Sequence, residues 1–369
     1  MMSDLIVGRS VRTQQRRYEL KGRVPRLFSR ALLALMLAIC ASPLALTGAP
    51  PSLQLLSSKR IWDQAPYNSF GDIIRFHDQW FCVFREGLAH APSPGKPGDG
   101  KLRVIVSKDA DSWKSAALLE ETGTDLRDPH LSITADGRLM IVAGGSKYPG
   151  GVFHGRQPRV AFSADGFHWT APQAVLGEGE WLWRVTWFKG AAYGISKFGS
   201  PSKESPDNPR RQNLVTSTDG VHWKTIVELK IPGGDESTLR FFPDGRMVAF
   251  VRCERPEDDR NVIGVSRPPY EKWDWHRTAN HIGGPNFIIL PDGTMVGGGR
   301  LTRNGESKTT IGVMDLTSYD PSLVLPSRGD SSYPGFAFHD GLLWVMYYSA
   351  REEDTTKTAI YLAKVRVGK

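Results

Sequence analysis

The sequence predicts an all-β protein, a six-bladed β-propeller with four-stranded antiparallel blades. Two observations lead to this prediction: a strand–turn–strand pattern repeats six times, and a second type of turn recurs in phase with it. The centres of the first turns lie at positions 78, 136, 189, 244, 292 and 340, which are 48 to 58 residues apart. A near-constant period of this size, filled with short strands, is typical of propellers.

The clearest copy of the repeated hairpin is DESTLRFFPDGRMVAFVR, at Asp235–Arg252. Bulky residues alternate on both sides of Asp244-Gly245, and an Asp-Gly pair tolerates the positive φ angles of a tight hairpin turn. The other five copies are DIIRFHDQWFCVFRE, LSITADGRLMIVAGG, RVTWFKGAAYGISK, NFIILPDGTMVGGGR and PGFAFHDGLLWVMYY. We therefore expect each copy to form the first two strands of one blade.

The second recurring turn has the form S-x-D-x-x-x-W. Copies lie at Ser107–Trp113, Ser163–Trp169 and Ser217–Trp223, and Ser266–Trp273 is a degenerate copy without the Asp. In such a turn the Asp side chain accepts hydrogen bonds from backbone N–H groups while the Trp packs beneath the blade. The motif is known as the Asp box, and we interpret its acids as structural.

The first 49 residues differ in composition from the remainder. A basic region extends to Arg30, an apolar run follows at Ala31–Cys40, and small residues continue to Ala49. This is the plan of a signal peptide, and ten apolar residues are too few to span a bilayer permanently. We expect residues 1–49 to direct export to the periplasm or medium, with membrane contact only through an uncleaved leader. Residues 50–369 would form the propeller.

The charge and the cysteines exclude several classes of function. The formal net charge is +8, but residues 50–369 carry 39 basic against 37 acidic side chains, so we expect no nucleic-acid partner. The cysteines after the leader, Cys82 and Cys253, are expected to be buried thiols. No metal-site spacing is present, so we expect neither a metal nor a cofactor. A closed propeller needs no partner chain, and we expect a monomer.

Antiparallel blades place the hairpin turns and the Asp boxes on one face of the ring. The other face receives the starts of first strands, the ends of second strands, and the long loops 87–100, 144–158, 198–211, 254–260 and 301–308. Long loops over the mouth of a rigid ring are where a binding site is expected. We also expect residues 358–367 to pair near residues 53–63 and close the ring.

Charged residues dominate this mouth. Starts of first strands contribute Asp72, Asp128, Arg184, Glu236, Asn286 and Tyr333, and ends of second strands contribute Arg85, Glu86, Lys197, Arg252 and Arg300. Converging arginines favour a planar anion, because a guanidinium binds a carboxylate through two hydrogen bonds. Glu236 beside Tyr333 indicates a phenol activated as a nucleophile. The aromatic rings of Trp181 and Trp183 are candidates for stacking on sugars.

From about residue 61 to residue 367, these features resemble the sialidase (neuraminidase) superfamily, whose members are six-bladed propellers with Asp boxes. The resemblance implies an arginine triad that holds the sugar carboxylate, a Tyr nucleophile assisted by a Glu, an Asp acid/base and retention of configuration. By position, Glu236 resembles the assisting glutamate and Tyr333 the nucleophile. Arg252 resembles the second triad arginine, and Arg300, with Arg303 as a competitor, resembles the third.

The first blade departs from the family pattern. Asn68–Ile74 lacks the Arg-Ile-Pro motif that supplies the first triad arginine. Arg85, which resembles a different pocket arginine, or Arg127 would have to replace it. The resemblance implies that the acid/base residue lies in the loop after Arg85. We favour Asp99 for this role, and the alternatives are His90, Glu86 and Asp128.

The sequence therefore predicts an exported, sialidase-like glycoside hydrolase that removes terminal sialic acid or a related acidic sugar from glycoconjugates. Its expected partner is a glycan that carries a carboxylate. Two alternatives remain open: a non-catalytic carbohydrate-binding propeller, and a propeller enzyme that acts on another anionic glycan. The expected catalytic residues are Tyr333, Glu236 and Asp99, and the expected substrate-binding residues are Arg85, Arg252, Arg300, Glu86, His90, Asp128 and Arg184.

Overall fold

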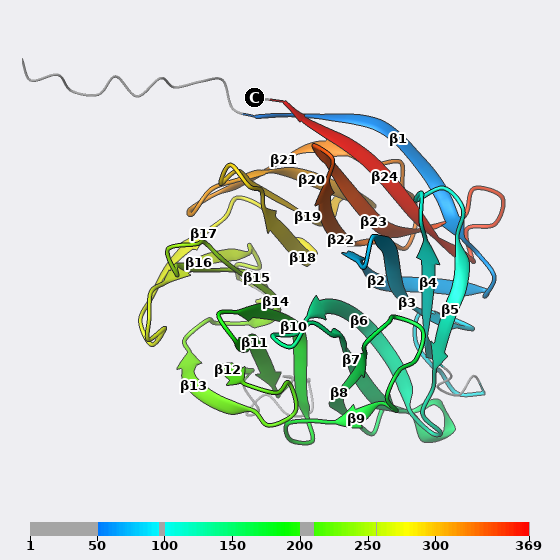
Figure 1. Ribbon diagram of the computed structural model, residues 1–369, viewed down its shortest axis with the longest axis horizontal. Helices are drawn as coiled ribbons and strands as arrows, with labels where there is room; N and C mark the ends of the chain where they lie inside the picture. Colours follow the sequence, from blue (N-terminus) through cyan, green and yellow to red (C-terminus); the bar gives the residue numbers. More distant parts are fainter. Residues whose placement is uncertain (1–50, 96–99, 200–209, 256, 369) are drawn as a thin grey trace, which may run out of the picture. The chain divides into compact units, whose positions relative to one another are not determined.

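The computed structural model describes residues 51–95, 100–199, 210–255 and 257–368. These residues form six four-stranded antiparallel sheets arranged as blades around a central axis (Figure 1). The sequence prediction of a six-bladed propeller is confirmed. The described residues contain no helix that is both long and apolar enough to cross a membrane.

Each blade is a simple up-and-down sheet whose first strand lies nearest the axis. Blade one holds β2 (Tyr67–Phe76), β3 (Gln79–Gly87), β4 (Lys101–Ser107) and β5 (Lys114–Leu119). Blade two holds β6 (Asp125–Ile133), β7 (Leu139–Lys147), β8 (Gly155–Ser163) and β9 (Gln173–Ala174), with a 3₁₀ turn at Pro149–Gly151. Blade three holds β10 (Glu180–Phe188), β11 (Ala191–Phe198), β12 (Arg211–Ser217) and β13 (Lys224–Leu229).

The second half of the ring follows the same order. Blade four holds β14 (Gly234–Phe241), β15 (Met247–Cys253), β16 (Val262–Ser266) and β17 (Trp273–Arg277). Blade five holds β18 (Ile282–Ile289), β19 (Met295–Arg303), β20 (Glu306–Met314) and β21 (Tyr319–Val324). Blade six holds β22 (Ser331–His339), β23 (Leu342–Ala350), β24 (Thr358–Gly368) and β1 (Ser52–Trp62).

The ring closes through a strand from each end of the described chain. β1 pairs antiparallel with β24, with Leu53 opposite Val367 and Trp62 opposite Ile360. Figure 1 shows β1 in blue beside β24 in red. The predicted pairing of these segments is confirmed, and the sheet of blade six thereby joins residues about three hundred positions apart in sequence.

The hydrophobic core consists of six clusters, one between each pair of neighbouring blades. Between blades one and two, for example, Phe81 and Val83 of β3 pack in one cluster with Leu131 of β6 and Ile141 of β7. Second strands such as β3 are buried on both faces, which explains their continuous apolar runs in the sequence. Both cysteines described, Cys82 and Cys253, are buried and free, as predicted.

The Asp-containing turns have the expected hydrogen bonds. Asp165 Oδ1 accepts from the backbone N–H groups of Phe167 and His168, each at 2.8 Å, and Trp169 Nε1 donates to the Gly166 carbonyl at 3.0 Å. In the degenerate copy, Trp273 Nε1 keeps the equivalent bond, to the carbonyl three residues earlier. These acids therefore stabilise turns.

The first strand of every blade carries a β-bulge near its start. The ladder shifts register between Ser69 and Gly71, Arg127 and His130, Leu182 and Val185, Gly234 and Ser237, Gly283 and Asn286, and Ser332 and Gly335. In four blades a bulge residue has a left-handed backbone: Phe70 (φ 47°), Asp128 (φ 50°), Gly284 (φ 59°) and Tyr333 (φ 55°). A bulge redirects side chains, so the same position in each blade can point toward the axis.

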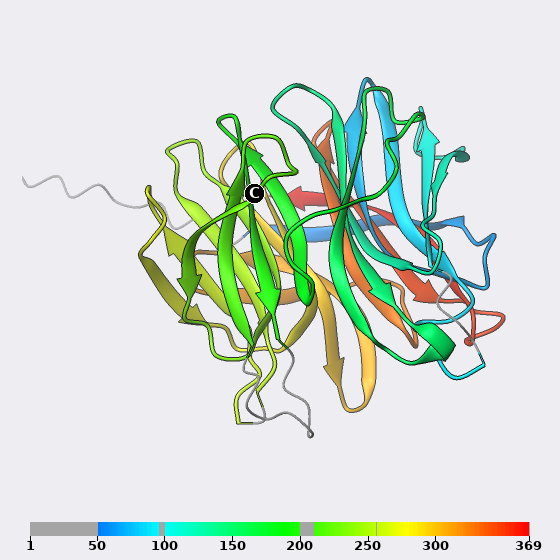
Figure 2. The ribbon, with the colours of Figure 1, turned by 90° about the horizontal axis from the view of Figure 1, so that it is seen from below.

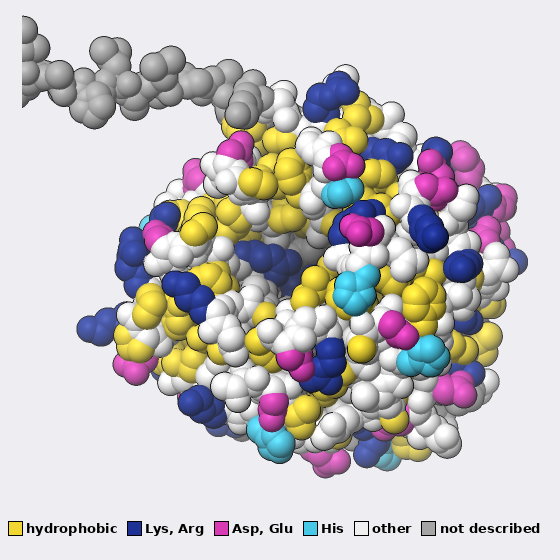
Figure 3. Space-filling model, viewed as in Figure 1, with side chains coloured by type: hydrophobic (Ala, Val, Ile, Leu, Met, Phe, Trp, Pro, Cys, Tyr) yellow, Lys and Arg dark blue, Asp and Glu magenta, His cyan; other side chains and the backbone are white. Residues whose placement is uncertain are grey.

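The strands run between the two faces of the ring, as the side view in Figure 2 shows. Down the axis, the molecule is hollowed at its centre, and Lys or Arg side chains lie in the hollow (Figure 3). One predicted loop is absent: β19 and β20 continue through most of residues 301–308 and leave only a tight turn at Asn304-Gly305.

Candidate functional site

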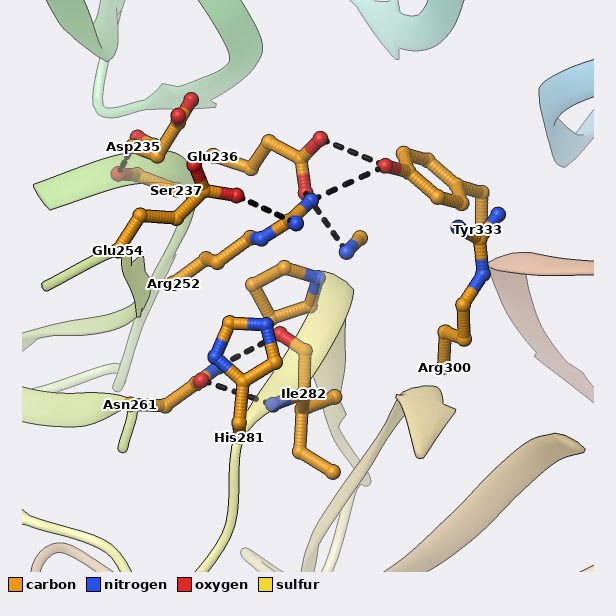
Figure 4. A network of polar contacts seen from close by, with 12 residues as sticks. Asp235, Glu236, Ser237, Arg252, Glu254, Asn261, His281, Ile282, Arg300 and Tyr333 are labelled. Atoms are coloured by element: carbon orange, nitrogen blue, oxygen red, sulfur yellow. Dashed lines mark hydrogen bonds and ion pairs between the residues drawn. The ribbon is translucent and has the colours of Figure 1, made fainter. Parts of the chain in front are cut away.

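Glu236 and Tyr333 meet at the axis from blades four and six. The Tyr333 hydroxyl donates to Glu236 Oε1 at 2.7 Å, and Arg252 Nη1 donates to Glu236 Oε2 at 3.0 Å and lies 3.3 Å from Tyr333 Oη. Figure 4 shows the Glu236 carboxylate pointing at both partners. Glu254 binds the other side of the Arg252 guanidinium, with an N–O distance of 2.5 Å. The structure thus brings together Tyr333, Glu236 and Arg252, three of the residues that the sequence placed at the mouth.

The backbone of blade five completes this group. The Gly284 N–H donates to Glu236 Oε2 at 2.7 Å, so the carboxylate accepts three hydrogen bonds from three different blades. A Cβ at Gly284 would lie 2.6 Å from the ring of Tyr333, so only glycine fits here. Because Gly284 has no side chain, blades five and six can lie this close together at the site.

Burial is the main electrostatic influence on Tyr333. It raises the pKa of the phenol well above its usual value, and the Glu236 carboxylate raises it further, while Arg252 and Arg300 lower it. The ring contacts Phe70 and Trp183 edge-on, with centroids 5.2 and 5.6 Å apart. These aromatic groups exclude water from one side of the phenol. Glu236 is the carboxylate that accepts the hydrogen bond of this buried phenol.

Arg300 lies beside Tyr333, with its guanidinium carbon 5.1 Å from the centre of the phenol ring. Its Nη2 donates to Asp330 Oδ1 at 2.9 Å and to the Tyr348 hydroxyl at 2.6 Å. His90 Nδ1 lies 2.5 Å from Asp330 Oδ2. Burial lowers the pKa of His90 to about 4, and nearby arginines add to this effect. His90 is thus a neutral partner of the group that holds Arg300.

Asp128 lies in a cavity of about 250 Å³ together with Glu236 and Arg252. Arg127 Nε donates to Asp128 Oδ2 at 3.2 Å. Burial raises the pKa of Asp128 to about 6, Arg127 opposes this shift, and the charge of Glu236 adds to it. A carboxyl with such a pKa exists in both protonation states near neutral pH, which general acid/base catalysis requires.

Three expected site residues lie elsewhere. Arg85 is fully buried, with Nε donating to Asp125 Oδ1 at 2.8 Å and Nη1 to the Ala89 carbonyl at 2.8 Å, so it does not face the pocket.

Glu86 binds Arg103 and the Trp62 indole on the side of blade one. Arg184 is buried in an ion pair with Asp72. In each of the three cases, an ion pair with another residue of the propeller holds the side chain away from the pocket. Asp99 lies outside the described residues.

The sequence did not indicate four other groups: the Gly284 N–H, Asp330, Tyr348 and Arg156. Asp330 precedes β22 and Tyr348 lies near the end of β23, and both accept hydrogen bonds from Arg300. Arg156 is the second residue of β8 and lines the cavity of Asp128. It lies within the loop 144–158 that was expected at the mouth, but the sequence did not single out this residue.

No protein-family model matches the chain, and no curated protein sequence matches it. Solved structures do. A protein of unknown function from Dyadobacter fermentans has 17% identity and a TM-score of 0.72, over 85% of this chain and 99% of that one. The α-L-arabinofuranosidase Arb93A from Fusarium graminearum has 15% identity and a TM-score of 0.62, over 85% and 98%.

The sialidase of Trypanosoma rangeli is also similar, with 12% identity and a TM-score of 0.64, over 86% of this chain and 60% of the sialidase. At these identities the likeness shows the fold and not the activity. The chain therefore shares the six-bladed propeller fold of the sialidases and of this arabinofuranosidase, as the sequence motifs predicted.

Proposed function

We propose that the protein is a retaining glycoside hydrolase that removes a terminal acidic sugar, sialic acid or a relative of it, from a glycoconjugate. The observation that carries the proposal is the hydrogen bond of 2.7 Å from Tyr333 to Glu236, held in place by Arg252 and the Gly284 N–H. A weak nucleophile with an adjacent base, itself oriented by further groups, is the arrangement that nucleophilic catalysis needs. The likeness of fold to a sialidase supports this proposal.

Arg252 and Arg300 would seat the carboxylate of the sugar on either side of Tyr333. Both guanidiniums lie within reach of the phenol, by the contacts of 3.3 Å to its oxygen and 5.1 Å to its ring centre. A neutral phenol suits an anionic substrate better than a carboxylate nucleophile, because a carboxylate would repel the carboxylate of the substrate. Arg127, in the cavity with Asp128, would supply the third cation in place of the missing first-blade arginine.

Asp128 would act as the acid/base in place of Asp99. In the first step the glycosidic bond breaks and the proton of Asp128 passes to the leaving oxygen, while the Tyr333 oxygen bonds to the anomeric carbon and Glu236 takes the phenol proton. In the second step Asp128 removes a proton from water, and the water oxygen bonds to the anomeric carbon. The bond to Tyr333 then breaks, and Glu236 returns the proton to the phenol. The pKa of about 6 and the shared cavity support this role.

The test is the release of 4-methylumbelliferone from its α-sialoside by residues 50–369. We expect turnover by the wild type and a loss of about 10³-fold or more in Tyr333→Phe, because the nucleophile is gone. Melting temperature controls for folding. No turnover by folded wild type would remove sialic acid as the substrate. In that case, glycan binding that Tyr333→Phe leaves intact would favour a carbohydrate-binding propeller.

We further propose that residues 1–49 direct export and that the exported protein is a monomer. The composition of the leader supports the first point. The mass of the protein recovered from the periplasm or medium would locate the cleavage site, and light scattering would give its oligomeric state. Retention of residues 1–49 on a cytoplasmic protein would contradict export.

A further inference from the structure

One wall of the Asp128 cavity comes from blades two and three. The side chains on it are Ser146, Tyr148, Phe153, Arg156, Trp181 and Lys197. A general acid protonates the oxygen of the leaving group, so that group must lie next to the acid. With Asp128 as the acid, which rests on the proposed function, the leaving sugar lies along this wall, and the wall determines which leaving groups are accepted.

Arg156 has a fixed position on this wall. The Trp181 ring packs against Gly144 of β7, where an added Cβ would lie 2.4 Å from the ring atoms. The guanidinium carbon of Arg156 lies 5.4 Å from the centre of the Trp181 ring, a cation–π contact. The planar group is thus held at the cavity before any ligand arrives, which reduces the entropy that binding would cost.

Arg156 also differs in its partners from the other cations that line the cavity, Arg127, Lys197 and Arg252. Each of these three has a carboxylate partner: Arg127 has Asp128, Lys197 has Asp235, and Arg252 has Glu236 and Glu254. Two further cations also have carboxylate partners: Arg210 has Asp235 and Glu254, and Arg300 has Asp330. Among the described residues, Arg156 has no carboxylate within ion-pair distance, and its hydrogen bond is a long one, 3.4 Å, to the Gly199 carbonyl.

A half-buried guanidinium that is held in a cavity without a carboxylate partner has donors ready for an anion. Burial disfavours its charged form and lowers the pKa of Arg156, so a bound anion would remove an existing cost. Tyr148 and Phe153, whose rings lie 5.5 Å apart, add an apolar edge next to it, and Phe153 is 51% exposed. A sugar that carries a carboxylate fits both features.

We propose that Arg156 binds an anionic group on the leaving sugar, so that the preferred substrate joins two acidic sugars in sequence. The donor sugar occupies the side of Tyr333 and Arg300, and the acidic leaving sugar lies against Arg156. The enzyme then removes a terminal acidic sugar from an acidic neighbour more efficiently than from a neutral one.

A matched pair of substrates tests this proposal. In α2,8-linked disialic acid the leaving group is a second sialic acid, whereas in α2,3-sialyllactose it is neutral lactose. We expect Arg156→Gln to lower kcat/KM for disialic acid by about 10- to 100-fold, the range for a lost hydrogen bond to a charged group. The values for sialyllactose and for the 4-methylumbelliferyl sialoside should change less than about 2-fold. Arg156→Lys, which keeps the charge, should recover part of the loss.

A binding measurement separates this inference from the proposed function. Calorimetry on Tyr333→Phe, alone and combined with Arg156→Gln, needs no turnover. If disialic acid binds Tyr333→Phe, and binds the double variant at least 10-fold more weakly, the result supports the role of Arg156. This holds even if the wild type hydrolyses nothing. Equal binding of disialic acid by both variants, or no binding by Tyr333→Phe, overturns the inference even if the wild type is an active sialidase. Equal losses on both natural substrates overturn it as well.

Discussion

At the scale of single residues, the site depends on one proton between Tyr333 and Glu236. The buried phenol cannot ionise alone, because its pKa is raised well above the usual value. In the proposed mechanism, the transfer of its proton to Glu236 therefore accompanies attack on the sugar. The backbone N–H of Gly284 and the guanidinium of Arg252 hold the receiving carboxylate from its other side.

Replacement of Glu236 by Gln tests this dependence. The amide keeps the shape of the side chain but cannot accept the phenol proton, so we expect kcat to fall by about 10²–10⁴-fold, as for lost general-base catalysis. Glu254→Gln is the matched control, since Glu254 binds the other side of Arg252 but does not contact Tyr333. Equal losses in the two variants would mean that Glu236 serves only to hold the arginine.

The raised pKa of Asp128 has a consequence for the pH dependence of activity. To act as an acid, Asp128 must be protonated. Its pKa of about 6 keeps it protonated at pH values well above the usual aspartate pKa of about 4. We expect kcat/KM for a sugar leaving group to decline tenfold per pH unit above about pH 6. The decline should be weaker for a nitrophenyl leaving group, which needs less protonation. The same profile for both leaving groups would assign the acid to another residue.

The same shift makes a prediction about stability. A carboxyl whose pKa is raised on folding favours the folded state while it is protonated, and this contribution is lost as the pH rises through about 6. Asp128→Asn removes the charge at every pH. We expect the variant to melt at a higher temperature than the wild type at pH 8 and at a similar temperature at pH 4. A lower melting temperature at pH 8 would show that the ion pair with Arg127 outweighs burial.

At the scale of elements, the bulges of the six first strands generate the site. Asp128, Glu236 and Tyr333 lie at the bulges of β6, β14 and β22, and the β18 bulge supplies the Gly284 N–H. A left-handed backbone at Asp128 and Tyr333 is uncommon for residues with side chains, and such strain is often found at functional sites. Under the proposed function, the bulges of blades two, four, five and six therefore supply the groups that act on the substrate.

Alanine substitutions at two glycines of blade five can distinguish a clash with Tyr333 at the bulge from backbone strain alone. Gly284 (φ 59°) and Gly293 (φ 88°) both have positive φ, but an added Cβ meets the Tyr333 ring only at Gly284, and at Gly293 it meets nothing within 4 Å. We expect both alanine variants to be destabilised, by about 1 kcal/mol or more. Only Gly284→Ala should lose most of its activity. Chemical denaturation and kinetics on both variants would check this.

The bulges also explain which site residues could be predicted. The rule that first strands start at the mouth found Asp128, Glu236 and Tyr333, since it depends only on the repeat. It failed for Arg184, the second residue of its bulge, which binds Asp72. The companion rule, that second strands end at the mouth, failed for Arg85, which binds Asp125. Whether a residue beside a bulge faces the pocket depends on partners in another blade, and a repeat pattern does not contain this information.

At the scale of the whole molecule, the period of the sequence determined the fold. Six hairpins and a terminal strand complementary to the start of the propeller leave few arrangements other than a closed ring. Loop lengths were less predictable. Residues 301–308 looked like a loop, yet the ladder between β19 and β20 continues to Arg303 opposite Glu306. Exposed strand ends made of polar residues show no alternation of apolar and polar side chains. The hydrophobic pattern therefore does not predict that these residues are part of a strand pair.

The closing sheet offers a test of how much the ring depends on it. β24 lies between β1 and β23, with Ala363 opposite both Ser58 and Val345. A proline at this position removes a backbone donor inside a sheet, so we expect Ala363→Pro to destabilise the protein by about 3 kcal/mol or more in urea unfolding. Ala363→Ser retains the N–H and serves as the control. Equal midpoints would show that the other five blades hold the ring without this strand.

The pairing of β1 with β24 also determines when the ring can close during biosynthesis. Gln54 and Arg366, which are hydrogen-bonded, lie 312 residues apart, so an unfinished chain on the ribosome has β1 but not its partner. Contacts between distant residues form slowly, because the chain must first lose the entropy of a large loop. β24, the last strand of the propeller in the sequence, therefore decides when the ring can close. Until then the nascent chain can form only an open array of blades.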